Sequence, residues 1–209
     1  MTTLTEQSLS QLQQIINNIN LTKGEREQIV IIADVSWQDY EDLLALLGDN
    51  TFFLVKYLRK TRQIMSPSYR HEVYKENIDI LLEAYFQEKG IRFYSLGSTT
   101  FRSEATQRGI EPDKSYCLNS RKNILDLVVE VVLASGSMDS LEIYQALGVS
   151  EVWFWQNSQL YVYCLTGQNY EKVGQSGLLP ELDLAIFASY ITWEEPFDAV
   201  FAFREQIRR

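Results

Sequence analysis

The fold is decided by residues 111–155, which read EPDKSYCLNSRKNILDLVVEVVLASGSMDSLEIYQALGVSEVWFW. Residues 124–133 in this stretch are mostly apolar and rich in β-branched side chains, a composition that suits a strand buried on both faces of a sheet. The residues after it predict a short helix and then another strand. Two acidic residues, Asp113 and Glu130, fall on what read as neighbouring strands. The stretch therefore predicts an α/β fold with a mixed sheet that carries two acids near its centre.

Glu130 needs an explanation, because an acid in the middle of an apolar strand costs several kcal/mol unless it is paired, protonated or bound to a cation. Asp126 lies on the same face of the predicted strand, but four residues of strand span roughly 13 Å, too far for the two acids to share one metal ion. Asp113 follows Pro112 at the head of residues 114–118. It is the predicted partner if that segment runs antiparallel beside the strand of Glu130.

Two interpretations of the acid pair stay open at this point. Two carboxylates that converge with water on a hard cation form a Mg²⁺ or Mn²⁺ site, which can generate a nucleophilic hydroxide and neutralise charge on a scissile phosphate. The alternative is that Glu130 forms a salt bridge with a buried Arg or Lys and catalyses nothing. The spacing alone does not separate the two.

The composition predicts one substantial core, since the chain has 209 residues of which 45% are hydrophobic. We expect an accessory helix within residues 1–28 and a single domain over residues 29–209; the helix docks on that domain or on a second copy, as in a homodimer. No apolar run approaches the roughly 20 residues of a membrane span, and the N-terminus lacks the features of a secretory signal. We therefore expect a cytoplasmic protein with no membrane contact. Cys117 and Cys164 read as reduced thiols in apolar surroundings.

The net charge of −9 argues against a non-specific electrostatic grip on nucleic acid, which depends on Lys and Arg side chains that neutralise phosphates. A local basic rim remains open as an alternative to simple solvated turns. Its candidates are Arg59, Lys60, Arg62 and Arg70 in one segment, and Arg121 with Lys122 in another.

Other elements follow from periodicity and capping. Ser36 and Asp39 form a capping-box pattern before a helix that ends at Gly48, and residues 52–58 and 63–65 read as a hairpin. The remaining expected elements are a helix over 69–89, strands at 28–32, 91–95, 159–165 and 170–173, and helices at 183–191 and 196–207. In the last helix, the predicted core face consists of Phe197, Val200, Phe201 and Phe203.

Several ordered motifs resemble one family. The motifs are Pro112-Asp113, Asp126-Leu127-Val128-Val129-Glu130-Val131, Leu141-x-x-Tyr144-x-x-x-Gly148-Val149-x-Glu151-x-Trp153, Ile64-Met65-Ser66-Pro67-Ser68 before His71-Glu72, and Gly97-Ser98-Thr99-Thr100-Phe101-Arg102. From roughly Trp37 to Leu184 the chain resembles the Uma-type family of restriction endonucleases, within the PD-(D/E)xK nuclease superfamily. The resemblance implies a restriction-endonuclease-like core with helices around a mixed sheet.

It also implies that Asp113 and Glu130 bind a divalent metal ion, Mg²⁺ or Mn²⁺, for hydrolysis of DNA phosphodiester bonds. The superfamily's helix acid maps onto Glu72, with His71 beside it.

One departure concerns the lysine that in the superfamily positions or activates water. Its usual place, two residues after the glutamate, is Val132, and its place in the Uma-type family, on the following helix, is Ser140. Lys75 is a candidate substitute because it lies on the same helix as Glu72, three residues on. Lys122 is another. Loss of a preorganised cation at a developing charge costs on the order of 10²-fold in rate.

The leading hypothesis is a metal-dependent endonuclease with Asp113, Glu130, Glu72 and Lys75 in its catalytic site. The first alternative is a catalytically impaired nuclease fold that acts as a binding or self-association module. The second is a structural protein that associates through an aromatic surface over residues 153–155, although alternating Trp and Phe also suit the core of a sheet.

Overall fold

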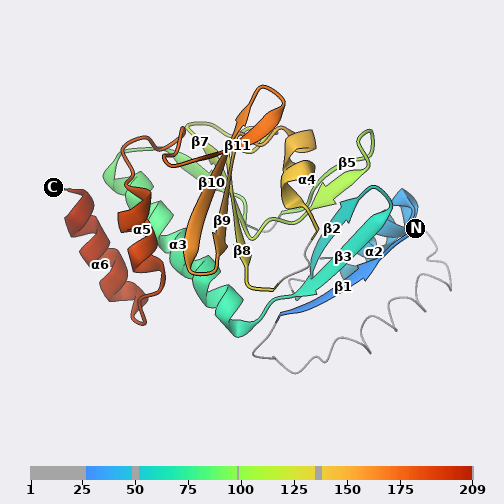
Figure 1. The fold of residues 1–209 in the computed structure, drawn as a ribbon, viewed down its shortest axis with the longest axis horizontal. Coiled ribbons are helices and arrows are strands. Elements are labelled where there is room, and N and C mark those ends of the chain that lie inside the picture. The colour runs from blue at the N-terminus through green and yellow to red at the C-terminus, as the bar shows by residue number, and fades with distance from the viewer. Residues whose placement is uncertain (1–26, 49–51, 98, 135–137, 209) are drawn as a thin grey trace.

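The computed structural model describes residues 27–48, 52–97, 99–134 and 138–208. These residues form a five-stranded sheet, a six-stranded sheet and five helices, and the predicted α/β fold is thereby confirmed (Figure 1). The accessory helix expected within residues 1–28 lies outside the described residues; of that range only Glu27 and Gln28 are described, and Gln28 begins the first strand of the fold. In the part of the chain that is described, no helix is both long and apolar enough to cross a membrane.

The six-stranded sheet carries the acid pair. Its strands, in spatial order, are β11 (Asn169–Val173), β10 (Gln159–Thr166), β9 (Glu151–Gln156), β8 (Leu127–Val132), β7 (Lys114–Leu118) and β4 (Phe93–Ser95). Neighbouring strands run antiparallel except β8 and β9, which are parallel. Because parallel neighbours need a crossover, the chain between them passes through helix α4 (Ser140–Leu147), which ends at Gly148 in the left-handed conformation with φ of 74°.

Strand β8 is covered on both faces, as its apolar sequence predicts. Leu127, Val129 and Val131 face the core beneath α3 (Tyr69–Glu88), α5 (Leu184–Ile191) and α6 (Pro196–Ile207), which gather on one side of the sheet (Figure 1). Val128 faces the other side and packs with residues of α4. The predicted alternation along this strand is confirmed, and it turns Glu130 toward α4.

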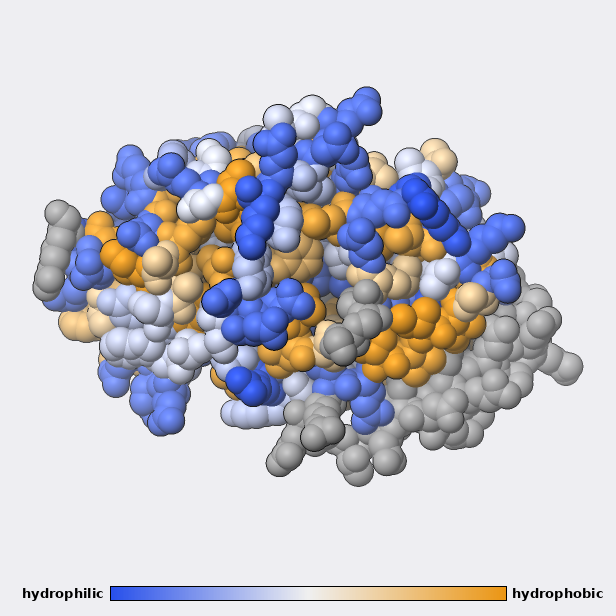
Figure 2. Space-filling model, viewed as in Figure 1, coloured by the Kyte–Doolittle hydropathy of each residue, from blue (hydrophilic) through white to orange (hydrophobic). Residues whose placement is uncertain are grey.

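The five-stranded sheet has the order β1 (Gln28–Ile32), β3 (Thr61–Ser66), β2 (Leu54–Leu58), β6 (Arg108–Ile110) and β5 (Phe101–Ser103). The predicted hairpin is confirmed, and its turn consists of Arg59 and Lys60, both with positive φ. Helix α2 (Trp37–Leu47) begins with the predicted capping box of Ser36 and Asp39. Figure 2 shows apolar surface over β1, where the side chain of Ile31 is half exposed.

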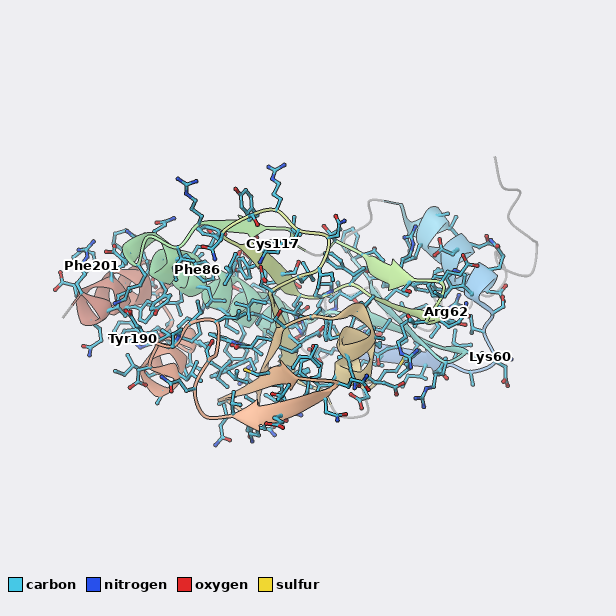
Figure 3. The ribbon with its side chains drawn as sticks, turned by 90° about the horizontal axis from the view of Figure 1, so that it is seen from above. Lys60, Arg62, Phe86, Cys117, Tyr190 and Phe201 are labelled. Atoms are coloured by element: carbon cyan, nitrogen blue, oxygen red, sulfur yellow. The ribbon has the colours of Figure 1, made fainter. Side chains whose placement is uncertain are left out.

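Two aromatic predictions have different outcomes. Trp153 and Trp155 are buried, so this part of the aromatic cluster belongs to the core of the sheet. In α6, however, Phe197 and Phe201 are 80% and 62% exposed, and the prediction that they face the core is wrong. The helix packs through a neighbouring stripe that includes buried Phe203, and this leaves the stripe of Phe197 and Phe201 outside, as Figure 3 shows for Phe201.

Candidate active site

The antiparallel pairing of β7 and β8 brings Asp113 and Glu130 to the same place. Lys114 is paired with Val129, so the residue before Lys114 lies beside the residue after Val129. The backbone N–H of Val131 donates to Oδ2 of Asp113 at 2.7 Å. Asp113 and Glu130 are 1% and 2% exposed. The strand arrangement that the sequence predicted for these two acids is therefore present.

Both carboxylate oxygens of Glu130 accept hydrogen bonds. Nζ of Lys56 donates to Oε2 at 3.0 Å, and the hydroxyl of Tyr144, on α4, donates to Oε1. Burial raises the pKa of Glu130, and the nearby charge of Asp113 acts in the same direction against the opposing charge of Lys56. The salt bridge to a buried lysine, which the second interpretation of Glu130 predicts, is thus present.

Asp113 is tied to a histidine that links two acids. Nε2 of His71 lies 2.8 Å from Oδ1 of Asp113, and its Nδ1 lies 2.5 Å from Oε1 of Glu27. Burial alone would lower the pKa of His71, but Asp113 and Glu27 outweigh it and raise that pKa to about 10. Burial alone would likewise raise the pKa of Asp113, but His71, followed by the N–H of Val131, lowers it. At neutral pH the imidazolium therefore donates to a carboxylate on each side.

Lys56 is the second buried cation of the site, and it comes from β2 in the other sheet. Besides Glu130, its ammonium group contacts Oγ of Ser140 at 2.8 Å. Ser140 is the first residue of α4, whose N-cap is Asp139. The position at which the family resemblance leads one to expect a lysine thus holds a hydroxyl that binds a lysine from elsewhere.

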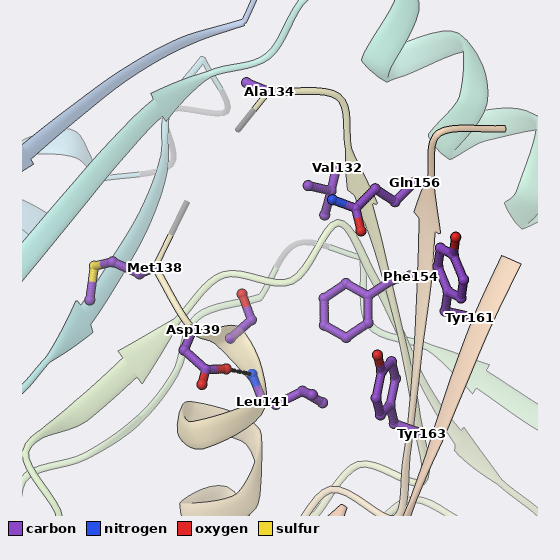
Figure 4. Close-up of a pocket in the computed structure, with 10 residues that line it drawn as sticks. Val132, Ala134, Met138, Asp139, Leu141, Phe154, Gln156, Tyr161 and Tyr163 are labelled. Atoms are coloured by element: carbon purple, nitrogen blue, oxygen red, sulfur yellow. Dashed lines mark hydrogen bonds between the residues drawn. The ribbon is translucent and has the colours of Figure 1, made fainter. Parts of the chain in front are cut away.

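A cavity of about 360 Å³ opens beside this network. Figure 4 shows it between the start of α4 and the face of β9 and β10, with Phe154 and Tyr163 turned toward it. Ser140 and Val132 also line it. Because Ser140 contacts Lys56, the cavity wall stands one side chain away from the ion pair with Glu130.

The other predicted site residues are engaged elsewhere. Lys75 directs its ammonium group to Glu72 and Glu76, and the side chains of these two acids are 41% and 54% exposed. Lys122 pairs with Asp126 at 2.7 Å. Asp126 also accepts a hydrogen bond from the backbone N–H of Leu118, the last residue of β7. The catalytic part assigned to Glu72 and Lys75 stays a prediction, and these contacts leave it without support.

Sequence reasoning missed Lys56, Tyr144 and Glu27 as neighbours of the acid pair. Lys56 had a signal, because it interrupts the apolar run of residues 52–58 in the way that Glu130 interrupts 124–133. A buried cation and a buried anion of this kind are expected to pair, because either charge left unpaired in the interior is strongly destabilising. Tyr144 was visible only as part of a motif, and Glu27 gave no local signal.

The donor chemistry of the acid pair suits a hard divalent cation. Mg²⁺ is commonly bound through one or two carboxylates, with water and substrate phosphates as further ligands. Across the described ranges, no group of three or more His, Cys, Asp and Glu side chains could hold a metal ion. Asp113 and Glu130 would therefore supply two ligands of an incomplete shell, at a point where Glu130 already faces a cation, the ammonium group of Lys56.

The mixed sheet and the two acids on adjacent strands are those of a restriction-endonuclease-like protein. The comparison with protein families agrees with this class: the profile described as "Uma2: Putative restriction endonuclease" matches residues 37–192. The chain belongs to the Uma2 family. No curated protein matches the chain.

Proposed function

We propose that this protein is a metal-dependent endonuclease that hydrolyses phosphodiester bonds in DNA, with Asp113 and Glu130 as the protein ligands of Mg²⁺ or Mn²⁺. The observation that carries the proposal is the burial of these two carboxylates together, near a cavity whose wall includes Ser140, the residue that contacts the Lys56 partner of Glu130. Membership in a family of restriction endonucleases supports the same substrate class.

The bound ion would supply Lewis-acid stabilisation of the phosphate and a more acidic bound water. The protein's own groups hold the two carboxylates in place. His71 and the N–H of Val131 fix the two oxygens of Asp113, while Tyr144 and Lys56 fix those of Glu130. A constellation whose rotamers are locked by such contacts needs little rearrangement when substrate arrives.

Contact with DNA has to overcome the net charge of −9. Of the predicted basic rim, Arg62 is only 2% exposed and donates to the carbonyl of Asp39, so it does not belong to the surface. The side chain of Arg59 is 70% exposed, although it pairs with Glu142. We therefore expect weak non-specific binding of DNA with only a modest dependence on salt, because few Lys and Arg side chains are placed to neutralise phosphates.

The test is cleavage of supercoiled plasmid DNA with Mg²⁺ or Mn²⁺, followed by gel analysis of nicked and linear products. The wild-type protein should nick the plasmid, and Glu130→Gln should abolish nicking while the far-UV circular dichroism spectrum is retained. Glu171→Gln, a change of the same kind on an exposed strand residue, serves as the control and should cut like wild type. Absence of cleavage with either metal, or cleavage unaffected by Glu130→Gln, would refute the proposal.

The alternative function is a catalytically impaired nuclease fold that binds partners or itself, and the specific observation in its favour is serine at position 140. Self-association through residues 1–28 stays a prediction, as does the cytoplasmic location. If the chain does self-associate through residues 1–28, light scattering should show a concentration-dependent dimer that weakens when these residues are removed.

A further inference from the structure

Lys56 is a buried lysine in a strand of otherwise apolar neighbours. It is 3% exposed, and its strand β2 reads Leu-Val-Lys-Tyr-Leu. An ammonium group in such a place costs several kcal/mol unless it is well paired. Its partners are Oε2 of Glu130 at 3.0 Å and Oγ of Ser140 at 2.8 Å. The pairing therefore links three elements: β2, β8 and the start of α4.

The backbone around Lys56 holds it close to the acid pair. Lys56 is paired with Ile110 of β6, and β6 leads within three residues to Asp113. Glu111, in between, is bound to Val55 twice: its N–H donates to the carbonyl of Val55 at 3.2 Å, and its side chain accepts from the N–H of Val55 at 3.1 Å. Strand β2 is thus fixed to the segment that carries Asp113, and the ammonium group is delivered from a rigid element.

We propose that Lys56 supplies, from β2, the site cation that position 140 lacks, and that Ser140 serves as its hydrogen-bond acceptor. Lys56 is in this sense a positioning residue, because it acts through Glu130, whose carboxylate it contacts directly. The inference rests on the proposed nuclease function for its consequence in catalysis. The placement of the cation can be tested without it.

A catalytically impaired site makes the opposite prediction for one substitution. If the site lacks a working cation, Ser140→Lys should create or raise activity. If Lys56 already fills that role, Ser140→Lys adds a second ammonium group against one carboxylate and should not raise the cleavage rate. The same substitution should help only when Lys56 has been removed.

The experiment compares wild type with Lys56→Met, Ser140→Lys and the double variant, and Lys89→Met serves as control. Lys89 also forms an ion pair, with Glu181 at 3.3 Å, but on the surface. Lys56→Met should lower plasmid cleavage by about a hundredfold, since Glu130 loses the group that holds its carboxylate in place and a displacement of about 1 Å can cost that much. It should also lower the folding equilibrium constant by about a hundredfold, because Glu130 keeps a buried charge without its cation. Lys89→Met should leave both within about threefold.

In the double variant, the lysine at 140 should restore at least tenfold of the lost cleavage and part of the lost stability in urea. Mn²⁺ binding, measured by electron paramagnetic resonance, adds a readout independent of turnover. Lys56→Met should tighten Mn²⁺ binding, because the ammonium group no longer competes for Glu130, and the double variant should return the affinity toward wild type. Lys56→Arg, which keeps the charge, covers the case in which Lys56→Met fails to fold, and it should retain more stability and more cleavage than Lys56→Met.

The outcomes separate the two proposals. A wild-type protein that cuts DNA while Lys56→Met cuts within threefold of it would overturn the role of Lys56 and leave the nuclease function intact. A wild-type protein that never cuts would refute the nuclease function. In that case the unfolding and Mn²⁺ measurements still decide the placement of the cation, which is overturned if the effects of the changes at 56 and 140 are simply additive.

Discussion

Glu151 provides a stringent test of how this fold is held together. It stands at the start of β9 and is 1% exposed. Oε1 accepts from Nε1 of Trp153 and from Oγ of Ser176, both at 2.6 Å. Oε2 accepts from the backbone N–H groups of Gly177 and Leu178 at 2.9 and 3.3 Å. One carboxylate thus fastens the loop after β11 to the centre of the six-stranded sheet.

Glu151→Gln keeps the shape of the side chain but replaces one acceptor oxygen by an NH₂ donor. In the better of its two orientations this group faces Trp153 and Ser176, where the hydroxyl can turn to accept but the indole N–H cannot. A buried donor without its acceptor costs about 1–3 kcal/mol. The remaining bonds also lose the assistance of the negative charge, which roughly doubles the strength of such bonds. We expect a loss of about 3 kcal/mol in the free energy of unfolding.

The assay is urea unfolding followed by tryptophan fluorescence, with circular dichroism as a second probe to check two-state behaviour. The variant should show a lower midpoint at an unchanged slope, which assigns the effect to stability. Glu171→Gln, on the exposed side of β11, is the matched control and should stay within about 0.5 kcal/mol of wild type. A Glu151→Gln midpoint equal to that of the control would refute the assignment of Glu151 as the anchor of the loop.

Two further predictions concern packing and thiol chemistry. A Cβ added at Gly109 would meet the hydroxyl oxygen of Tyr40 at less than contact distance, so Gly109→Ala should lower the free energy of unfolding by about 1–3 kcal/mol. Gly174 has open space around it, so Gly174→Ala should leave the free energy of unfolding unchanged. Equal urea midpoints for the two variants would contradict this packing. Burial, followed by a hydrogen bond to the carboxylate of Glu151, raises the pKa of the Cys164 thiol to about 11. Alkylation of Cys164, followed by peptide mass spectrometry, should therefore be slow at pH 8 and become about tenfold faster per pH unit up to about pH 11. An alkylation rate at pH 8 equal to that of free cysteine would contradict the raised pKa.

The elements of the fold were predictable where local chemistry specifies them. The capping box at Ser36 and Asp39, the hairpin around Arg59 and Lys60, and the buried strand of Glu130 all follow from short patterns, and all are present. The core face of α6 was not predictable in the same way. An apolar helix end with several phenylalanines offers more than one stripe, and only the neighbouring helices decide which stripe is covered.

In the candidate site too, only the contacts that follow from local sequence patterns could be predicted. The closeness of Asp113 and Glu130 could be predicted, because Asp113 heads the strand that runs antiparallel beside the strand of Glu130. The contacts of Lys56 with Glu130 and Ser140 join residues separated by 74 and 84 positions. No periodicity or spacing within one element specifies such contacts, since they depend on how two sheets are placed against each other.

The energetics of the network bear on why these groups are present. Asp113 and Glu130 face His71 and Lys56, so carboxylates and cations are buried together. A buried ion pair often gains no net stability over well-packed apolar side chains, because the desolvation of both charges offsets their attraction. Stability alone is therefore a weak reason for burying two carboxylates and two cations in one cluster. The proposed metal site would be a sufficient reason, since it would need carboxylate oxygens fixed by donors and a cation held beside them on a rigid strand.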